Sequence, residues 1–371
     1  MTSNENPKEA LLAGKQKQDT ISNQQRVYCS STKGTKPSIF DWTLDYELSD
    51  DEANAIADPE WIIPNLVISG HIVLIPAEPN GGKTTIMFHL AGQMAKKGYQ
   101  VCYVNTDISG GDAKSMVEQA KANHFILMLP DMKASKSMDT VILKLTEMSE
   151  AGGTYNNVVF IFDTLKKMVN VISKSAAKNL FQLLRRLSAK GMTIVLLAHT
   201  NKYTDKEGQP IYEGTGDMRA DVDDLIYLIP QKHDDGSMTV TTKPDKQRGA
   251  FIPISFSIDP ARLVTLLDEV IDTLTAKKIE AERKDDEVII TSITDAILAG
   301  NILQKSIITF CSENTAIGVG ERAIKRTLIK YSLNIDEEKP PETNVITIPS
   351  IWNKTRGGKN SYNFSIIKPI T

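Results

Sequence analysis

The stretch Ala77–Thr85, AEPNGGKTT, has the residue types that suit binding of a phosphate group. The turn Asn80–Gly82 can point successive backbone N–H groups at one centre, and a helix that follows would aim its positive dipole end there. Lys83 would reach the β- and γ-phosphates of a nucleotide, and the hydroxyl of Thr84 would bind Mg²⁺, with Thr85 beside it. With ATP as the expected nucleotide, the residues predicted to contact it are Glu78, Pro79, Asn80, Gly81, Gly82, Lys83, Thr84 and Thr85.

A P-loop requires a strand before this stretch and a helix after it. His71–Ile75 is a short apolar run typical of a buried strand, and Ile86–Ala95 carries an apolar stripe at helical spacing. One position departs from the pattern GxxxxGK[ST], because Ala77 stands where the pattern has Gly, and Ala adopts a positive φ less readily. The alternative is an ordinary glycine-rich turn between a strand and a helix.

Two aspartates follow predicted strands and could complete a nucleotide site. Asp163 comes directly after Val158–Phe162, where a carboxylate could hold Mg²⁺ directly or through water, and a helix cap is the alternative role. Asp107 follows the strand Gln100–Val104, where its carboxylate could polarise the attacking water. For Asp107 the alternative is a turn-forming role before the next glycines.

His199 follows a further apolar strand, Thr193–Ala198. At a strand end its side chain could touch the γ-phosphate on one side and the next loop on the other, and so signal hydrolysis to that loop. A lone histidine is also a common core residue. Lys166 and Lys167, after Asp163, could face phosphate or DNA, and Lys174 could line a channel with them.

Strand and helix patterns alternate along residues 71–199. That alternation predicts a mainly parallel sheet covered by helices on both faces, with the ligand crevice at the carboxyl ends of the strands. Later strands alternate in polarity and are joined by turn residues, so we predict that they are antiparallel. These strands are Leu225–Ile229, Ser237–Thr242 and Ile252–Ile258.

Composition places the chain among ordinary globular proteins. Its 371 residues, 41% hydrophobic and 24% charged, allow two domains, and a formal net charge of -3 means that any nucleic-acid surface must be local. The three cysteines are far apart and suggest neither disulfides nor a zinc site. No apolar run is long enough to span a membrane, and no secretory signal pattern opens the chain, so we expect a cytoplasmic protein without a membrane partner.

The last part of the chain has a separate pattern. Helices are predicted at residues 287–298, 303–311 and 320–331, followed by strands at 344–348 and 361–366 that are separated by a basic tip at 352–360. Three helices and a β-hairpin resemble a winged helix-turn-helix, whose third helix would present cations to solvent. Those cations are Arg322, Lys325, Arg326 and Lys330. The alternative is a small oligomerisation module.

Four segments are therefore predicted. Residues 1–38 have the composition of a disordered tail, and residues 39–270 would form the ATPase domain. A charged helical linker at residues 271–285 would lead to the winged-helix-like domain at residues 286–371.

Four motifs follow the P-loop in order: VVFIFDTLKK, LLAHTNK, EGTGDMRADVDDLIYL and KPDKQRG. Together they resemble the RecA-fold ATPases of the RepA-type hexameric replicative helicases and their AAA-family relatives in phages, plasmids and mobile elements. The resemblance covers about residues 60–260. The fold class that it implies is α/β, a RecA-like P-loop core with a central, mainly parallel sheet, to which the sequence adds a small C-terminal α+β winged-helix-like domain.

The resemblance implies a hexameric ring with ATP at each interface, where one subunit supplies the P-loop and its neighbour a cationic finger. Lys246-Gln-Arg248 matches the Lys-x-Arg of that finger, and Arg219 is the competing candidate. The resemblance also implies that the loop Thr200–Asp217 faces a central channel, where cations follow phosphates and aromatic rings stack on bases. The suitable side chains in that loop are Asn201, Lys202, Tyr203, Lys206 and Tyr212.

The sequence thus predicts a ring-forming ATPase that acts as a DNA motor, a replicative helicase with single-stranded or forked DNA and a replication protein as partners. Its catalytic residues would be Lys83, Asp107, Asp163, His199, Lys246 and Arg248, and its Mg²⁺ ligands Thr84 and Asp163. Two alternatives stay open. One is a RecA-fold switch whose ATP state acts on a partner through the C-terminal domain, and the other is a recombinase-like ATPase on single-stranded DNA.

Overall fold

The computed structural model describes residues 41–54, 56, 58–108, 110–130, 132–168, 174–204, 210–212, 216–313, 318–335, 349–358 and 361–367. The predicted tail at residues 1–38 lies outside these ranges. The chain divides into two compact units, Met1–Ile56 and Ala57–Thr371. The first contains the 3₁₀ helix η1 (Asp41–Tyr46) and the helix α2 (Asp50–Asn54).

A large sheet organises the second unit, with strand order β12-β11-β10-β9-β3-β7-β6-β4-β5. The strands from β9 to β5 in this order are parallel, and β9, β10, β11 and β12 pair antiparallel with one another. Their bounds are β3 Ile72–Ala77, β4 Gln100–Asn105, β5 Ile126–Met128, β6 Val158–Asp163, β7 Thr193–Thr204, β9 Asp224–Lys232, β10 Met238–Lys246, β11 Ser255–Ile258 and β12 Val264–Leu266. A separate pair, β1 (Trp61–Ile63) and β2 (Val67–Ile68), precedes them.

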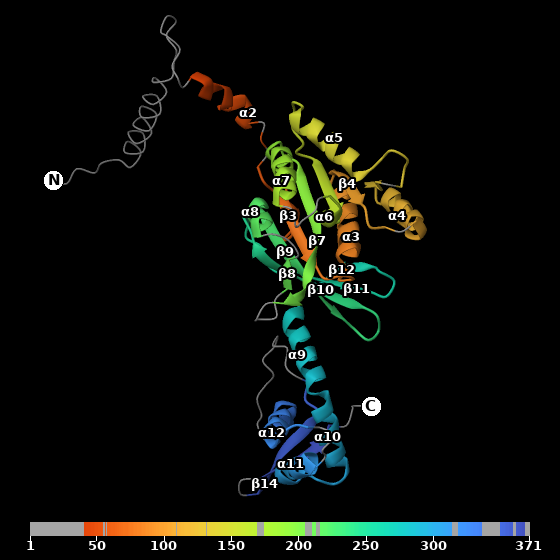
Figure 1. Ribbon diagram of the computed structural model, residues 1–371, viewed down its shortest axis with the longest axis vertical. Coiled ribbons are helices and arrows are strands. Elements are labelled where there is room, and N and C mark those ends of the chain that lie inside the picture. Colours follow the sequence, from red (N-terminus) through yellow and green to blue (C-terminus); the bar gives the residue numbers. More distant parts are fainter. Residues whose placement is uncertain are drawn as a thin grey trace, which may run out of the picture. The chain divides into compact units, whose positions relative to one another are not determined.

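Side chains of the parallel strands alternate between two cores. In β3, Val73 and Ile75 enter one core and Ile72 and Leu74 enter the other. A strand that is buried on both faces shows this pattern. Figure 1 shows helices on both sides of the sheet, with α3 (Lys83–Lys96) and α4 (Gly110–Ala122) covering one face and α5 (Met138–Glu150) and α7 (Lys174–Ala189) the other. The predicted α/β architecture with a mainly parallel sheet is confirmed.

One strand is longer than predicted. We expected β7 to end before His199, but it continues to Thr204 and pairs antiparallel with β8 (Pro210–Tyr212), with Thr200 opposite Tyr212. The prediction of a loop from Thr200 is therefore wrong for its first residues, because cross-strand hydrogen bonds hold this polar segment extended. The short helix α8 (Gly216–Asp221) then leads into β9.

Helix α9 (Thr273–Asp285) precedes a C-terminal module of three helices and a small sheet. The helices are α10 (Glu287–Leu298), α11 (Gln304–Glu313) and α12 (Glu321–Lys330), close to their predicted positions. The sheet has the order β13-β14-β15, with bounds Ser332–Asn334, Trp352–Gly358 and Ser361–Ile366. An isolated bridge joins Leu303, before α11, to Asn363 in β15.

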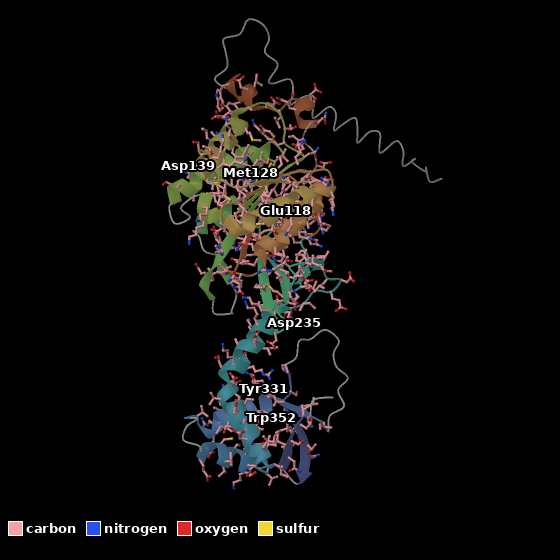
Figure 2. The ribbon with its side chains drawn as sticks, turned by 90° about the vertical axis from the view of Figure 1, so that its right-hand side faces the viewer. Glu118, Met128, Asp139, Asp235, Tyr331 and Trp352 are labelled. Carbon is pink, nitrogen blue, oxygen red and sulfur yellow. The ribbon has the colours of Figure 1, made fainter. Side chains whose placement is uncertain are left out.

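The hairpin of this module differs from the prediction. Residues 352–358, which we expected in the basic tip, form the strand β14, and the predicted strand at 344–348 lies outside the described residues. Trp352 explains the difference, because its side chain is fully buried and lies against Tyr331 with ring centroids 6.3 Å apart (Figure 2). The density of Gly, Lys and Asn in this segment favoured a turn, but the segment pairs with β13 and β15, and Trp352 packs into the core of the module.

One predicted cation of α12 is not free in solvent. Lys330 forms ion pairs with Glu282 at 2.7 Å and with Asp286 at 2.9 Å, which raise its pKa against the effect of burial. Arg322, Lys325 and Arg326 are exposed, as expected. In the described part of the chain, every helix is too short or too polar to cross a lipid bilayer.

Candidate active site

The stretch Ala77–Thr85 has the strand-turn-helix context that a P-loop needs. It lies between β3, whose residues are all buried, and α3. Gly82 occupies the N-cap of α3 with φ 78°, and no side chain caps the helix there. The first-turn N–H groups of α3 therefore face the loop without a side-chain acceptor, which is the usual arrangement at an anion site.

Glycine is favoured at position 82 by its positive φ and at position 81 by a close backbone atom. A Cβ atom on Gly82 would lie 2.6 Å from Cδ1 of Ile258, and one on Gly81 would lie 2.9 Å from the carbonyl oxygen of Glu78. The Gly81 N–H donates to that same carbonyl at 3.1 Å, which closes the turn. Asn80 also has a positive φ, 57°, a conformation that asparagine tolerates better than most residues. Ala77 ends β3 in an ordinary buried position.

Thr84 and Asp163 meet at the carboxyl ends of β3 and β6. The Thr84 hydroxyl donates to Oδ2 of Asp163 at 2.6 Å, although 79 residues separate them. The Tyr103 hydroxyl donates to the same oxygen at 2.9 Å. Burial, with Asp163 as the second cause, raises the pKa of Tyr103 far above its ordinary value, so this phenol stays a donor. Tyr103 was missed in the sequence because it reads as one more apolar residue of β4.

Lys83 lies next to this pair and is 6% exposed. Burial lowers the pKa of its ammonium group, and the carboxylates of Asp163 and Asp107 act in the opposite direction. The structure thus brings Lys83, Thr84, Asp107 and Asp163 into one region, as the sequence predicted.

Asp107 is the most exposed member of the group. Its backbone N–H donates to Oδ1 of Asn105 at 2.9 Å, and its carboxylate lies 3.9 Å from Nζ of Lys167. Asn105 pairs with Asp163 in the β4–β6 register, and Asp107 lies two residues further along the chain, beyond the carboxyl end of β4. This position leaves the carboxylate accessible to water, which a general base needs.

His199 is opposite Ala77 in the β3–β7 register and is partly exposed. It therefore lies at the strand end from which the P-loop starts. Of the residues expected to contact nucleic acid, Asn201 donates to the Tyr212 carbonyl at 3.4 Å, and Tyr212 is buried. Lys206 and the side chains of Lys202, Tyr203 and Lys174 lie outside the described residues.

Two contacts of the loop join residues that are far apart in sequence. Glu78 forms an ion pair with Lys277 of α9 at 2.7 Å. Arg262, in the turn between β11 and β12, lies with Nη1 at 3.5 Å from the Thr85 hydroxyl and has a positive φ of 69°. No local motif marks Lys277 or Arg262, so the sequence could not have identified them.

Lys246 is held within its own chain. Its ammonium group donates to the carbonyl oxygens of Arg219, Ala220 and Val222 at 2.9, 2.9 and 2.7 Å. These carbonyls belong to the end of α8 and the residue after it, where helix carbonyls lack helical partners. Lys246 thus stabilises the end of α8. Arg219, the competing finger candidate, pairs with Asp245 at 2.9 Å.

Arg248 lies beside two buried aspartates. Its Nη1 is 3.0 Å from Oδ1 of Asp223, and its backbone N–H donates to Oδ1 of Asp224 at 2.8 Å. Asp224 also contacts Nδ1 of His71 at 2.6 Å. Because Oδ2 of Asp223 accepts the N–H of Ile72, this cluster lies at the amino end of β3.

The two groups of predicted residues are therefore at opposite ends of the sheet. Ile72 begins β3 and Ala77 ends it, and five residue steps at about 3.3 Å correspond to roughly 16 Å. The structure brings Lys83, Thr84, Asp107, Asp163 and His199 to the carboxyl ends of the strands. It does not bring Lys246, Arg248 or Arg219 to them.

The residues present fit a nucleotide with Mg²⁺. Hydroxyl and carboxylate oxygens, such as those of Thr84 and Asp163, are ligands that Mg²⁺ prefers. No group of three or more His, Cys, Asp or Glu side chains forms a metal site within the described ranges. Mg²⁺ at this pair would therefore complete its shell with phosphate oxygens and water, as is usual when it accompanies a nucleotide.

Comparison with known proteins gives a family match over part of the chain. Residues 43–205 match the AAA domain family, a range that includes the P-loop, Asp107, Asp163 and His199. The crystal structure of the flagellar accessory protein FlaH from Methanocaldococcus jannaschii is similar over 55% of this chain and 92% of FlaH, with 17% identity and a TM-score of 0.39. No curated protein matches the chain. The family match and the site geometry make this region an AAA-type P-loop ATPase domain, which implies nucleotide binding, usually with Mg²⁺.

Proposed function

We propose that this chain is a DNA motor that hydrolyses ATP as a ring of identical subunits, of the RepA-type helicase class of phages and mobile elements. The observation that carries the proposal is the separation of two sets of residues. Lys83, Thr84 and Asp163 would form one half of a nucleotide site, while Arg248 lies at the other end of the same sheet. A head-to-tail arrangement of copies would place the second set of one copy near the first set of the next.

In this function each residue at the carboxyl ends of the strands has a role. Lys83 would hold the β- and γ-phosphates, and Thr84 and Asp163 would hold Mg²⁺, which supplies charge neutralisation on the phosphates. Asp107 would accept a proton from the attacking water. His199, next to the start of the P-loop in the sheet, would pass the state of the γ-phosphate to the β7–β8 hairpin.

The C-terminal module would act as a winged-helix accessory domain. The exposed Arg322, Lys325 and Arg326 of α12 would supply phosphate contacts, and the β14–β15 hairpin would be the wing. A second candidate function is a RecA-fold switch that acts through this module. The Glu78–Lys277 ion pair favours it, because it joins the P-loop to the helix before the module.

Hydrolysis of ATP with and without single-stranded DNA, followed by unwinding of a forked duplex, tests the motor. We expect turnover that single-stranded DNA stimulates, ATP-dependent unwinding, and loss of both in Lys83→Ala, because that lysine holds the transferred phosphate. Turnover without stimulation or unwinding would favour the switch. Stimulation and filaments on DNA without unwinding would favour a recombinase-like protein. Equal turnover in the wild type and Lys83→Ala would contradict the P-loop assignment.

A further inference from the structure

Arg262 lies at the tip of the hairpin formed by β11 and β12, in a backbone conformation that arginine rarely adopts. Its φ is 69°, in the left-handed region that favours glycine. Hydrogen bonds fix this conformation, since the Arg262 N–H donates to the Asp259 carbonyl at 2.9 Å and the Leu263 N–H donates to Oδ1 of Asp259 at 2.8 Å. Glycine is common at this position of a short hairpin loop, so an arginine that keeps a strained backbone here points to a function of its side chain.

The hairpin is fixed against the start of α3. Ile258 of β11 lies so close to the N-cap of this helix that a Cβ atom on Gly82 would be 2.6 Å from its Cδ1. Val264 pairs with Ile258 across the hairpin and packs against the core that contains Ile86 of α3. The hairpin therefore has a defined position beside the helix, as Figure 1 shows for β12.

From this tip the guanidinium group of Arg262 reaches the first turn of α3. Its Nη1 lies 3.5 Å from the Thr85 hydroxyl, a weak contact at the limit of a hydrogen bond. Arg262 is exposed, and within the described residues no carboxylate forms an ion pair with it. A guanidinium group has five N–H donors, so most of them stay available for a ligand at the P-loop.

Thr84 and Thr85 face different sides of the sheet. The Thr84 hydroxyl donates to Asp163 of β6, whereas the Thr85 hydroxyl faces the tip between β11 and β12, and β6 and β11 lie on opposite sides of β3. A triphosphate at α3 would have its terminal phosphate on the β6 side, since the candidate Mg²⁺ ligands and Asp107 are there. Its α-phosphate would then lie on the side of Thr85 and Arg262.

We propose that Arg262 binds the α-phosphate of the nucleotide held by the P-loop of its own chain. A guanidinium group suits this ligand, because it donates paired hydrogen bonds to the oxygens of one phosphate and keeps its charge at neutral pH. The contact is within one subunit and at a phosphate that ATP and ADP share, so it strengthens the binding of both. The inference rests on the nucleotide site of the proposed function, but it requires neither a ring nor DNA.

Titration calorimetry with ADP and Mg²⁺, together with thermal unfolding, tests this contact in Arg262→Gln and Arg262→Gly. Both variants should bind ADP about tenfold more weakly, because they lose a charge-assisted hydrogen bond. Arg262→Gly should keep or raise the Tm, since glycine adopts the positive φ without strain. A lower Tm in Arg262→Gly together with weaker ADP binding would assign Arg262 a structural role and overturn the inference.

Turnover gives an independent measurement. A contact that is equally strong in the ground state and the transition state changes KM and leaves kcat unchanged. We therefore expect kcat of Arg262→Gln at saturating ATP to stay within about twofold of wild type. A large fall in kcat with unchanged ADP affinity would place Arg262 at the terminal phosphate and overturn the inference.

Two exposed residues away from the hairpin supply matched controls. Lys96→Gln removes a cation from the last turn of α3, and His124→Gly replaces another residue with a positive φ, 62°, two residues before β5. We expect wild-type ADP affinity in both. A loss in Lys96→Gln as large as that in Arg262→Gln would assign the effect to overall charge and overturn the inference.

Sulfur substitution identifies the phosphate that Arg262 contacts, because sulfur is a weak acceptor. Wild type and Arg262→Gln are titrated with the two diastereomers of ADP that carry sulfur on the α-phosphorus, and with ADP that carries sulfur on the β-phosphorus. For one α-thio diastereomer the loss caused by Arg262→Gln should be smaller than for ADP by about threefold or more, and for the β-thio analogue it should equal that for ADP. An equal loss with every ligand, or a smaller loss with the β-thio analogue alone, would overturn the inference.

The inference and the function beneath it can fail separately. Unchanged ADP affinity in Arg262→Gln, with weaker ADP binding in Lys83→Ala, would overturn the inference alone. A wild-type protein that binds no ADP would overturn the proposed function and the inference together.

Discussion

At the scale of single residues, the site depends on how burial and charge act on Lys83. Lys83 is a buried residue, and this burial lowers the pKa of its ammonium group, while Asp163 and Asp107 supply the opposite charge that favours the protonated form. Thr84 and Tyr103 both donate to Asp163, so this carboxylate is held in place by two hydroxyl groups. Hydrogen bonds between side chains therefore hold the carboxylate of this candidate site in place.

A pH dependence follows from Lys83. Because its pKa is below the ordinary lysine value, the ammonium group that attracts phosphate is lost at a lower pH than for an exposed lysine. We expect the affinity for ADP, measured by titration calorimetry, to fall as pH rises, beginning below the ordinary lysine pKa of about 10.4. Lys83→Arg is the control, because guanidinium keeps its charge over this range. An affinity of the wild type that stays constant to about pH 10 would contradict the prediction.

At the scale of elements, α8 depends on one side chain from β10. Helix α8 has only six residues, too few to be stable alone, and Lys246 binds three carbonyl groups at its end. The helix in turn forms one wall of the groove that Arg185 and Arg248 line. A lysine that resembled a finger in the sequence thus holds the element beside which the arginines lie.

Replacing Lys246 tests this role. Lys246→Met keeps the apolar stem but removes the ammonium group, so we expect a loss of about 1–2 kcal/mol in unfolding free energy from the unpaired carbonyls. Hydrogen exchange in α8 should rise. Lys232→Met, at an exposed position in the neighbouring strand, is the control and should change stability by less than about 0.5 kcal/mol. A Lys246→Met protein with full stability but no hydrolysis would instead assign Lys246 a direct catalytic role.

At the scale of the whole molecule, the described residues form three hydrophobic cores. Two lie on the faces of the large sheet, and the third belongs to the C-terminal module. The core of the module includes Trp352 and Tyr331 but no residue of the large sheet. Folding of the module should therefore be separable from nucleotide binding.

Trp352→Ala tests that separation. Removing a fully buried Trp should cost about 3–5 kcal/mol and unfold the module. We expect hydrogen exchange to increase from α10 to β15 while ADP affinity is unchanged. Tyr362→Ala is the control, because Tyr362 is 37% exposed and its ring lies under Lys354 at 4.1 Å, a contact of about 1 kcal/mol or less. Loss of ADP binding in Trp352→Ala would show that the module supports the ATPase core.

The features that could be predicted from the sequence are those that a local pattern of residues encodes. The P-loop, the strand that ends in Asp163 and the alternation of strands and helices all depend on neighbouring residues, and the structure confirms them. The role of Asp223 could not be predicted, since it depends on Arg185, Arg248 and Ile72, which come together only when the sheet forms. The extension of β7 and the strand β14 were missed for a related reason, because pairing and burial override the preferences of polar residues.

The placement of Asp223 and Lys83 at opposite ends of one sheet has a consequence for regulation. Under the proposed function, a chain on its own would hold a nucleotide beside Lys83, while its Arg248 lies at the other end of the same sheet. Hydrolysis per molecule would then rise with protein concentration, and dilute protein would store ATP with little turnover. Assembly would activate hydrolysis, and no separate inhibitor would be needed to limit ATP turnover by unassembled subunits.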